Sequence, residues 1–263
     1  SVSHHPRTVR AITFDLWDTL VIDDSDEVER ARRGLQSKDA TRRNGFAALA
    51  RKHRPELSDA VITEAYNLAQ ARFRHWWKKE HHTPPVAEWL TVGFTALDIE
   101  DADGIVALAD ELAGMEVEIP PQPVPHVRQM LTALKGRVPL AIVSDTINTP
   151  ASGLRAILRQ HDLLDFFEVC AFSDEVGHSK PHRAGYAHVA ATLGIPIEGI
   201  VHVGDRQETD VDGVQRVGGR AVLYTGAIDR HQGDTTAEVT CADYAAFEAL
   251  LGTLGELVPG AHG

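Results

Sequence analysis

The chain has 263 residues, of which 43% are hydrophobic and 24% are charged, a composition typical of an ordinary globular protein. Its 26 Lys and Arg residues stand against 38 Asp and Glu residues, so the formal net charge is −12. An acidic surface repels phosphate backbones and anionic lipids, so we expect neither nucleic acid nor a membrane as a partner.

Further classes of protein are excluded by the cysteines and by the absence of long apolar runs. The two cysteines, Cys170 and Cys241, are too few for a disulfide framework. No apolar run approaches the roughly 20 residues of a membrane span. Residues Ser1–Arg10 lack the apolar centre of a secretory signal. We therefore expect a cytoplasmic protein.

The first predicted strand is Ala11–Asp15 (AITFD), a short and almost continuous apolar run. Residues 23–123 contain no convincing strand, and we expect them to form a helical insertion. Within them, Ser58 is a candidate N-cap of a helix whose apolar residues recur at spacings of three and four. These apolar residues are Ile62, Tyr66, Ala69, Phe73 and Trp76.

The rest of the insertion is divided by proline and by candidate caps. Pro84–Pro85 breaks the chain, and Val86 opens another helical run. Asp101 or Asp103 is expected to start a further helix. The proline-rich stretch Pro120–Pro125 (PPQPVP) is interpreted as the linker back to the sheet.

Strands and helices alternate after the insertion. Apolar runs predict strands over 139–144, 167–172, 200–204 and 220–224. Helical segments are expected at about 124–135, 150–160, 183–193 and 209–217. This alternation predicts an α/β fold with a doubly wound, Rossmann-like parallel sheet of about five strands. We predict that residues 1–22 and 124–263 form this core and that 23–123 form an all-helical cap domain.

Polar residues follow the predicted strands, at the point where each strand ends. They are Asp15 after the first strand, Ser144 and Asp145 after the second, Lys180 beyond the third, and Asp205 and Asp210 after the fourth. Ligands of open α/β sheets bind at the carboxyl ends of the strands, so we expect these side chains to meet at one edge.

The types of these residues indicate a chemistry. Three acids cannot lie together ionised without a cation, and Mg²⁺ prefers hard oxygen ligands. An ionised Asp15 beside a metal is a competent nucleophile that can form an aspartyl-phosphate. Lys180 can neutralise both the nucleophile and an incoming phosphate, and Ser144 can donate a hydrogen bond to a phosphoryl oxygen.

Four segments resemble the motifs of the haloacid dehalogenase superfamily in their order and spacing. Phe14–Leu20 (FDLWDTL) resembles the first motif, usually FDxDGTL, and AIVS ending at Ser144 is similar to the second. Gly177–Pro181 (GHSKP) is similar to the third, and Gly204–Asp210 (GDRQETD) matches the fourth, GDxxxxD. The resemblance covers essentially residues 11–225, and the helical insertion corresponds to the type 1 cap of that family.

This resemblance implies a Mg²⁺-dependent hydrolase and a role for each matching residue. The implied catalytic residues are Asp15 as nucleophile, with Ser144 and Lys180 holding the transferring group. The implied metal ligands are Asp15, the backbone carbonyl of Trp17, Asp205 and Asp210. The implied substrate-binding residues are Ser144, Asp145, Lys180 and Trp17. The expected partner is a small anionic molecule, and the expected state is a monomer or a homodimer.

Trp17 departs from the family pattern. Phosphatases of the family carry a second Asp at this position, which protonates the leaving oxygen and later activates water. Tryptophan cannot transfer protons, and loss of a general acid–base group typically costs about 10²–10⁴-fold in rate. Asp18, at the position of the usual Gly, is a candidate proton donor, although we favour a role in capping the turn. Asp145 and His178 are further candidates.

Several reactions therefore stay open. The favoured prediction is a phosphatase that acts on a small phosphorylated metabolite through an aspartyl-phosphate. The alternative is a hydrolytic 2-haloacid dehalogenase that acts through an aspartyl ester, because such members carry an aromatic residue at the position of Trp17. The intact Asp205 and Asp210 disfavour it, since dehalogenases use no metal. A weak or inactive binding protein and a phosphonate-cleaving enzyme using Lys78 or Lys79 rank lower.

Other conspicuous residues have simpler interpretations. Arg72–His82 is basic and aromatic; it is a candidate substrate contact, but we favour an amphipathic helix whose aromatic residues pack in the cap. The pairs His4–His5 and His81–His82 lack partners at zinc-site spacing, so we expect no metal there. His202, inside the fourth predicted strand, is interpreted as a core histidine with satisfied hydrogen bonds.

Overall fold

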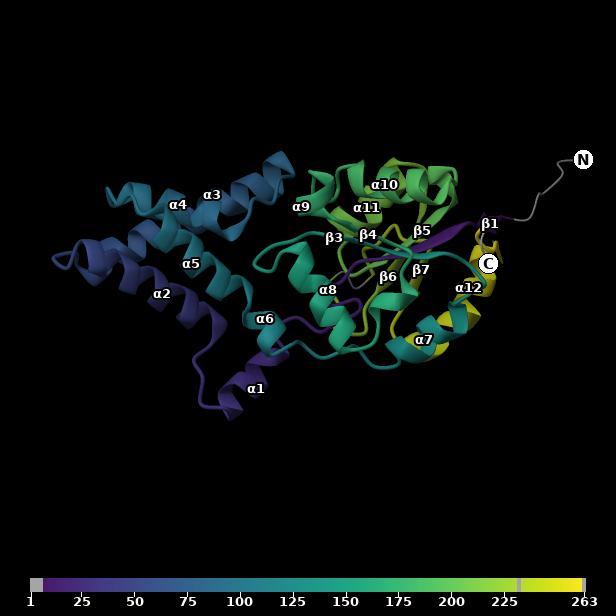
Figure 1. Ribbon diagram of the computed structural model, residues 1–263. Helices are drawn as coiled ribbons and strands as arrows, with labels where there is room; N and C mark the ends of the chain where they lie inside the picture. The colour runs from purple at the N-terminus through teal and green to yellow at the C-terminus, as the bar shows by residue number, and fades with distance from the viewer. Residues whose placement is uncertain (1–6, 231–232, 262–263) are drawn as a thin grey trace, which may run out of the picture. The chain divides into compact units, whose positions relative to one another are not determined.

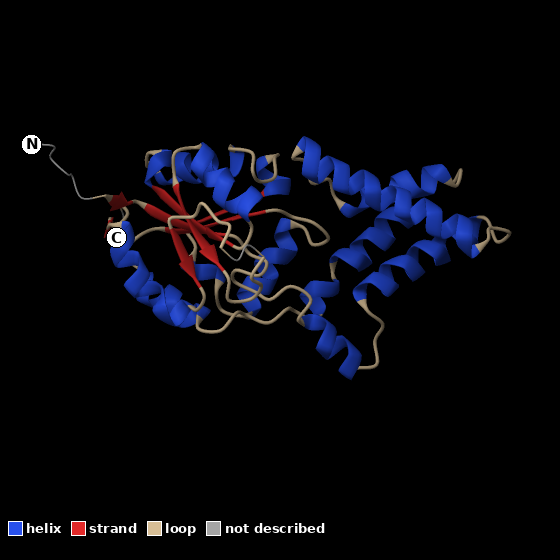
Figure 2. Cartoon of the chain, turned by 180° about the vertical axis from the view of Figure 1, so that it is seen from behind, coloured by secondary structure: helices blue, strands red, loops and turns tan. Residues whose placement is uncertain are grey.

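The computed structural model describes residues 7–230 and 233–261, and the His4–His5 pair lies outside this range. The described chain contains a region of strands and helices and a region of helices alone (Figure 2). Among the described residues, no helix combines the length and the apolar character needed to cross a membrane.

The chain divides into two compact units. The first, called here the core unit, comprises the residues up to Asp23, Gln122–Asp145 and the residues from Leu158 on. The second, called here the helical unit, comprises Asp24–Pro121 and Thr146–Ile157. This division groups Thr146–Ile157 with the helices, whereas the bounds inferred from the sequence assign that stretch to the core.

The core unit contains a six-stranded sheet in the order β4-β3-β2-β5-β6-β7, and every neighbouring pair is parallel. The strands are β2 (Ala11–Phe14), β3 (Leu140–Ser144), β4 (Val169–Phe172), β5 (Ile200–Gly204), β6 (Arg220–Tyr224) and β7 (Val239–Cys241). The predicted doubly wound α/β fold is confirmed, and the five predicted strands are all present. The sixth strand, β7, was missed.

Helices cover both faces of this sheet. They are α7 (Val127–Leu134), α9 (Ser173–Val176), α10 (Ala184–Leu193), α11 (Asp212–Arg216) and α12 (Phe247–Leu254). A further helix, α8 (Ala151–Gln160), begins in the helical unit and ends in the core unit. Figure 1 shows α10 and α11 on one face, and α7 and α12 on the other. Successive strand residues point to opposite faces. Accordingly, Ala11 packs with Tyr186 of α10, whereas the Phe14 ring contacts Phe247 of α12.

A second, two-stranded sheet joins the beginning and the end of the described chain. β1 (Thr8–Val9) pairs in parallel with β8 (Glu256–Leu257). The backbone N–H of Glu256 donates to the carbonyl of Arg7 at 2.9 Å, and that of Val258 donates to Val9 at 2.9 Å. The segment after Gly255 is therefore paired to the strand region that precedes β2.

The described residues 24–121 form helices and their connections, in agreement with the predicted helical insertion. The helices are α1 (Asp26–Arg32), α2 (Lys38–His53), α3 (Asp59–Glu80), α4 (Val86–Ala96), α5 (Ala102–Ala113) and α6 (Met115–Glu118). Ser58 caps α3 by accepting the N–H of Val61, and Asp101 caps α5 by accepting that of Gly104, as expected.

The predicted apolar stripe of α3 faces the core of the helical unit. Four of its members, Ile62, Tyr66, Ala69 and Phe73, are buried, and they pack with Phe46, Trp89 and Phe94. Trp76 and Trp77 are partly buried against the same core, and the cations of Arg72 and Lys78 lie over their rings at 4.5 and 3.8 Å. The packing interpretation of Arg72–His82 accounts for these contacts.

A buried ion cluster connects helices of this unit. The Nζ of Lys38, whose side chain is 3% exposed, lies 3.0 Å from both Asp24 and Asp26 and 2.9 Å from Glu116. The hydroxyl of Thr149 donates to the other oxygen of Glu116 at 2.6 Å. One lysine thereby joins the beginning of α2 to α1, α6 and the segment around residue 149.

Candidate active site

Asp15 follows the central strand at the point where the order of the sheet reverses. From β2 the chain continues to β3 and β4 on one side, and β5, β6 and β7 lie on the other. The backbone N–H of Asp15 donates to the carbonyl of Val203 on β5 at 2.9 Å, which continues the β2–β5 pairing up to this residue. Such a reversal point is where open α/β sheets bind their ligands.

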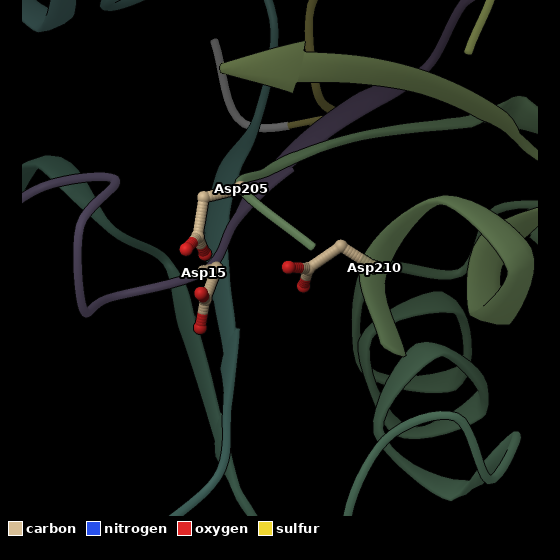
Figure 3. A group of neighbouring side chains, drawn as sticks. All are labelled: Asp15, Asp205 and Asp210. Carbon is tan, nitrogen blue, oxygen red and sulfur yellow. The ribbon is translucent and has the colours of Figure 1, made fainter. Parts of the chain in front are cut away.

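The carboxylates of Asp15, Asp205 and Asp210 gather at this edge. One oxygen from each lies within 4.8 Å of the others, and all three residues are buried. Figure 3 shows the side chains of Asp15 and Asp205 beside each other, with the carboxyl group of Asp210 directed toward them. The Oδ1 atom of Asp205 is buried without a hydrogen-bond partner among the described residues. The residues expected to supply carboxylate ligands are therefore together.

Lys180 lies against two of these carboxylates. Its Nζ donates to Asp15 at 2.9 Å and to Asp210 at 2.6 Å, and its side chain is 4% exposed. Burial alone would lower the pKa of Lys180, but the negative charges of Asp15 and Asp210 outweigh burial and raise that pKa well above its ordinary value. The lysine therefore stays charged and acts as a fixed positive group.

Ser144 and Asp145, at the end of β3, are both buried in the same unit. The Ser144 hydroxyl lies 3.5 Å from the carbonyl of Asp145, a weak interaction at best. The Asp145 carboxylate accepts the backbone N–H of Lys180 at 2.9 Å. Asp145 thus ties the end of β3 to the segment that carries the lysine.

The turn after Asp15 explains part of the departure from the family pattern. Asp18 has φ +56°, a left-handed conformation that glycine adopts most easily and that Asp tolerates. Its N–H donates to the carbonyl of Val21 at 2.7 Å, and its Oδ1 accepts the N–H of Asp23 at 3.0 Å. Asp18 therefore braces the turn, whatever further role it has. Trp17, one residue earlier, is partly buried.

Two residues at the site carried no motif signal. Arg230, in the connection after β6, donates to Asp205 Oδ2 at 3.1 Å and to Asp18 Oδ2 at 3.2 Å. His202, which the sequence analysis treated as a core residue, is completely buried and lies 2.8 Å from Asp210 and 2.7 Å from Thr13. A carboxylate can only accept, so His202 Nε2 donates to Asp210 while Nδ1 accepts from the Thr13 hydroxyl.

Electrostatics at the cluster favour a bound cation. Burial and the neighbouring charges of Asp15 and Asp210 raise the pKa of Asp205 to about 8. Burial would also raise the pKa of Asp210, but Lys180 and His202 outweigh it and hold this pKa below its ordinary value. Three converging carboxylates and one unpartnered buried oxygen fit a divalent cation with hard oxygen ligands. Asp15, Asp205 and Asp210 are the residues that would hold it.

The sequence also matches a family of known hydrolases. Residues 9–218 match the family model of the haloacid dehalogenase-like hydrolases. The chain therefore belongs to the haloacid dehalogenase-like hydrolases, and the resemblance deduced from its four motifs is confirmed.

Individual relatives include enzymes of two kinds. Phosphoglycolate phosphatase of Escherichia coli (strain K12) is 30% identical over 138 residues, 50% of each chain, so the chain spans about half the length of the curated relatives that it matches. A 2-haloacid dehalogenase from Pseudomonas syringae is 22% identical, with a TM-score of 0.67 over 93% of this chain and 99% of that one.

Two further solved structures share the fold. A HAD phosphatase from Thermococcus onnurineus is 22% identical, with a TM-score of 0.62 over 95% of this chain and 100% of that one. The HAD-hydrolase YfnB from Bacillus subtilis, solved with bound magnesium, is 18% identical, with a TM-score of 0.59 over 94% and 99% of the two chains. At these identities the likeness concerns the fold.

Proposed function

We propose that this protein is a Mg²⁺-dependent phosphatase that hydrolyses a small phosphorylated metabolite through an aspartyl-phosphate on Asp15. The observation that carries the proposal is the buried group of Asp15, Asp205 and Asp210, with Lys180 donating to the first and the third. A nucleophilic carboxylate beside a cation site and a fixed ammonium group is suited to attack on an anionic phosphate.

In the proposed reaction, an oxygen of Asp15 attacks phosphorus in line with the leaving oxygen. The bond between Asp15 and phosphorus forms as the bond to the leaving oxygen breaks, and that oxygen keeps the electron pair. Lys180 neutralises charge on the transferring group, and the Ser144 hydroxyl donates to a phosphoryl oxygen. A bound divalent cation supplies further stabilisation of that charge. Water then hydrolyses the aspartyl-phosphate, which restores the Asp15 carboxylate and releases phosphate.

The proposal includes a substrate class, which follows from Trp17. Tryptophan cannot protonate the leaving oxygen, and the nearby acid–base groups have other partners. Asp18 accepts two hydrogen bonds, Lys180 is held charged between two carboxylates, and His202 is enclosed between Thr13 and Asp210. We therefore expect substrates whose leaving group is stable as an anion, such as acyl, enol or aryl phosphates.

The second candidate, a 2-haloacid dehalogenase, is supported by the aromatic residue at position 17. Halide leaves without a proton, so an enzyme of this kind does not need the acid that Trp17 replaces. The pair Asp205 and Asp210 argues against it, because two buried carboxylates next to the nucleophile repel an anionic substrate unless a cation accompanies them.

One experiment distinguishes the phosphatase from the dehalogenase. It measures turnover of phosphate esters and of 2-haloacids by the full chain, with Mg²⁺ and with excess chelator. We expect phosphate release that requires Mg²⁺ and is lost in chelator. Phosphate release that persists in chelator would contradict the proposal, and halide release without metal would establish the alternative.

The variant Asp15→Asn is expected to abolish phosphate release, because an amide is not a nucleophile at phosphorus. Asp162→Asn, the same change at an exposed surface aspartate, serves as the control and should keep the wild-type rate. Retained activity of Asp15→Asn would remove the nucleophile assignment.

A further inference from the structure

Two charged residues outside the expected set of ligands form a bridge to Asp205. Arg230 uses Nε to donate to Asp205 Oδ2 at 3.1 Å and one terminal nitrogen to donate to Asp18 Oδ2 at 3.2 Å. The carboxyl groups of both aspartates are almost completely buried, and the arginine side chain is 29% exposed. A guanidinium held by two buried carboxylates has a well-defined position.

The bridge leaves one oxygen of Asp205 for the cation. Oδ2 is taken by Arg230, whereas Oδ1 is buried and has no hydrogen-bond partner among the described residues. Groups that hydrogen-bond the far side of a metal ligand fix its orientation and tune its affinity for the metal. Arg230 is placed to do this for Asp205.

Asp18 balances the charge that Arg230 brings to the site. Asp15, Asp205 and Asp210 together with Lys180 carry a formal charge of −2, which one divalent cation neutralises. Arg230 alone would reduce this to −1, and its positive charge would compete with the cation for Asp205. Asp18 restores the balance, because its carboxylate shares the same guanidinium.

We propose that Asp18 and Arg230 are a positioning pair for the metal ligand Asp205, in which Arg230 orients the carboxylate and Asp18 offsets the charge of Arg230. The inference rests on the metal site of the proposed function. It assigns Asp18 a role as a fixed acceptor, distinct from that of a proton donor. Asn at this position keeps the turn, because it tolerates the left-handed conformation and can accept the N–H of Asp23.

The test is a double-mutant cycle with Asp18→Asn, Arg230→Gln and the double variant, in the full chain. Mg²⁺ binding is measured by titration calorimetry without substrate. We expect Asp18→Asn to weaken Mg²⁺ binding about tenfold, the lower end of the range for lost outer partners of metal ligands. In the Arg230→Gln background, Asp18→Asn should alter the Mg²⁺ affinity less than about twofold, because the arginine charge that Asp18 offsets is no longer present.

Two outcomes of this cycle would contradict the proposed positioning pair. An equal loss of affinity in both backgrounds would mean that Asp18 acts directly on the cation, and an unchanged affinity of Asp18→Asn would mean that it does not act at all. Asp18→Gly, which introduces the residue usual in the family and suits φ +56°, should reproduce the tenfold loss, so the test does not depend on one variant.

Asp162→Asn is the matched control. Asp162 is another left-handed aspartate beside an arginine, with φ +54° and its side chain 88% exposed. It precedes β4, and therefore lies toward the amino edge of the sheet, so its substitution should leave Mg²⁺ binding unchanged. If the wild-type protein binds no Mg²⁺, the metal-dependent function itself fails; if it binds and Asp18→Asn binds equally well, only the positioning pair fails.

Discussion

At the scale of single residues, the site combines a cluster of three acids and a lysine with a turn that departs from the family pattern. Lys180 donates a hydrogen bond to Asp15, and the turn that follows Asp15 carries Trp17 and Asp18. Asp18 has a left-handed backbone conformation. Its carboxylate accepts one hydrogen bond from the N–H of Asp23 and another from Arg230, so it acts as an acceptor. For the proposed phosphatase reaction, we therefore expect the residues of this turn to affect the departure of the leaving group more than the attack by Asp15.

Restoring an acid at position 17 tests this interpretation. We expect Trp17→Asp to raise the rate on alkyl phosphates, whose leaving oxygen needs a proton, by up to about 10²-fold. Aryl phosphates with acidic phenols should change much less, since their leaving groups need no proton. The measurement is kcat/KM over a series of phosphate esters that differ in leaving-group pKa. An equal change across the series would contradict the missing-acid account.

The raised pKa of Asp205 predicts how metal binding depends on pH. Burial, followed by Asp15 and Asp210, raises this pKa from 3.8 to about 8, so below pH 8 the metal-free protein keeps a proton that a cation must displace. Apparent Mg²⁺ affinity should therefore rise from pH 6 to pH 8 and level off above. Calorimetry in two buffers of different ionisation enthalpy should detect proton release at pH 6.5 and little at pH 9.

The raised pKa of Asp205 also makes the stability of the metal-free protein depend on pH. A carboxyl group whose folded pKa exceeds its unfolded pKa stabilises the fold below the unfolded value, and this contribution is lost as pH rises through the folded value. For Asp205 the window runs from about pH 4 to pH 8 in the metal-free protein. A metal affinity independent of pH over this window would show that Asp205 does not hold the displaced proton.

Some residues of the site could be predicted from the sequence, and others could not. The positions of Asp15, Lys180, Asp205 and Asp210 could be predicted, because motif spacing and strand ends point to one edge of the sheet. Arg230 could not, since a single arginine in a long connection has no local pattern that ties it to a carboxylate far away in the chain. Its contact depends on how the connection after β6 returns to the sheet.

At the scale of elements, local patterns predicted what local interactions determine. Ser58 and Asp101 were recognisable as caps because a cap acts within three residues. The strand β7 was missed because Val239–Cys241 is short and contains a polar Thr240 at the exposed edge of the sheet. The β1–β8 pairing depends on residues from opposite ends of the described chain, which no window of sequence compares.

The buried ion cluster of the helical unit gives a prediction at this scale. Lys38→Met leaves Asp26 and Glu116 buried next to each other without their cation, so we expect a loss of about 3 kcal/mol in the free energy of unfolding. Chemical denaturation of the full chain measures it. The control is Arg32→Met, which removes an exposed ion pair with Glu29 and should change stability by less than about 1 kcal/mol. Equal effects would mean that the cluster contributes no more than a surface pair.

At the scale of the whole molecule, the sequence predicted a core with a helical insertion after the first strand of the sheet. The strands and their parallel order are confirmed, because near-continuous apolar runs that alternate with helices permit few other arrangements. Sequence patterns could not predict that Thr146–Ile157 belongs to the helical unit. This assignment follows from packing, such as that of Ile147 against the apolar residues of the helical unit.

Cation binding should be visible in the stability of the whole chain. A ligand that binds the folded state alone, at 100 times its Kd, stabilises it by about 2.7 kcal/mol. For a chain of this size we expect Mg²⁺ at that excess to raise the midpoint of thermal unfolding by roughly 5–10 °C. Asp205→Asn should lose most of this increase, whereas Asp162→Asn should keep it. An equal increase in both variants would place the bound ion elsewhere.

The central position of β2 has a consequence for biosynthesis. The strand that leads to Asp15 is synthesised before both of its neighbours in the sheet, Leu140–Ser144 and Ile200–Gly204. Until both have emerged, this apolar strand lacks both of the partners it has in the folded sheet, and unpaired apolar strands favour aggregation. A nascent chain halted before residue 200 therefore carries Asp15 without Asp205 and Asp210, and the carboxylate cluster can form only after residue 210 has been synthesised.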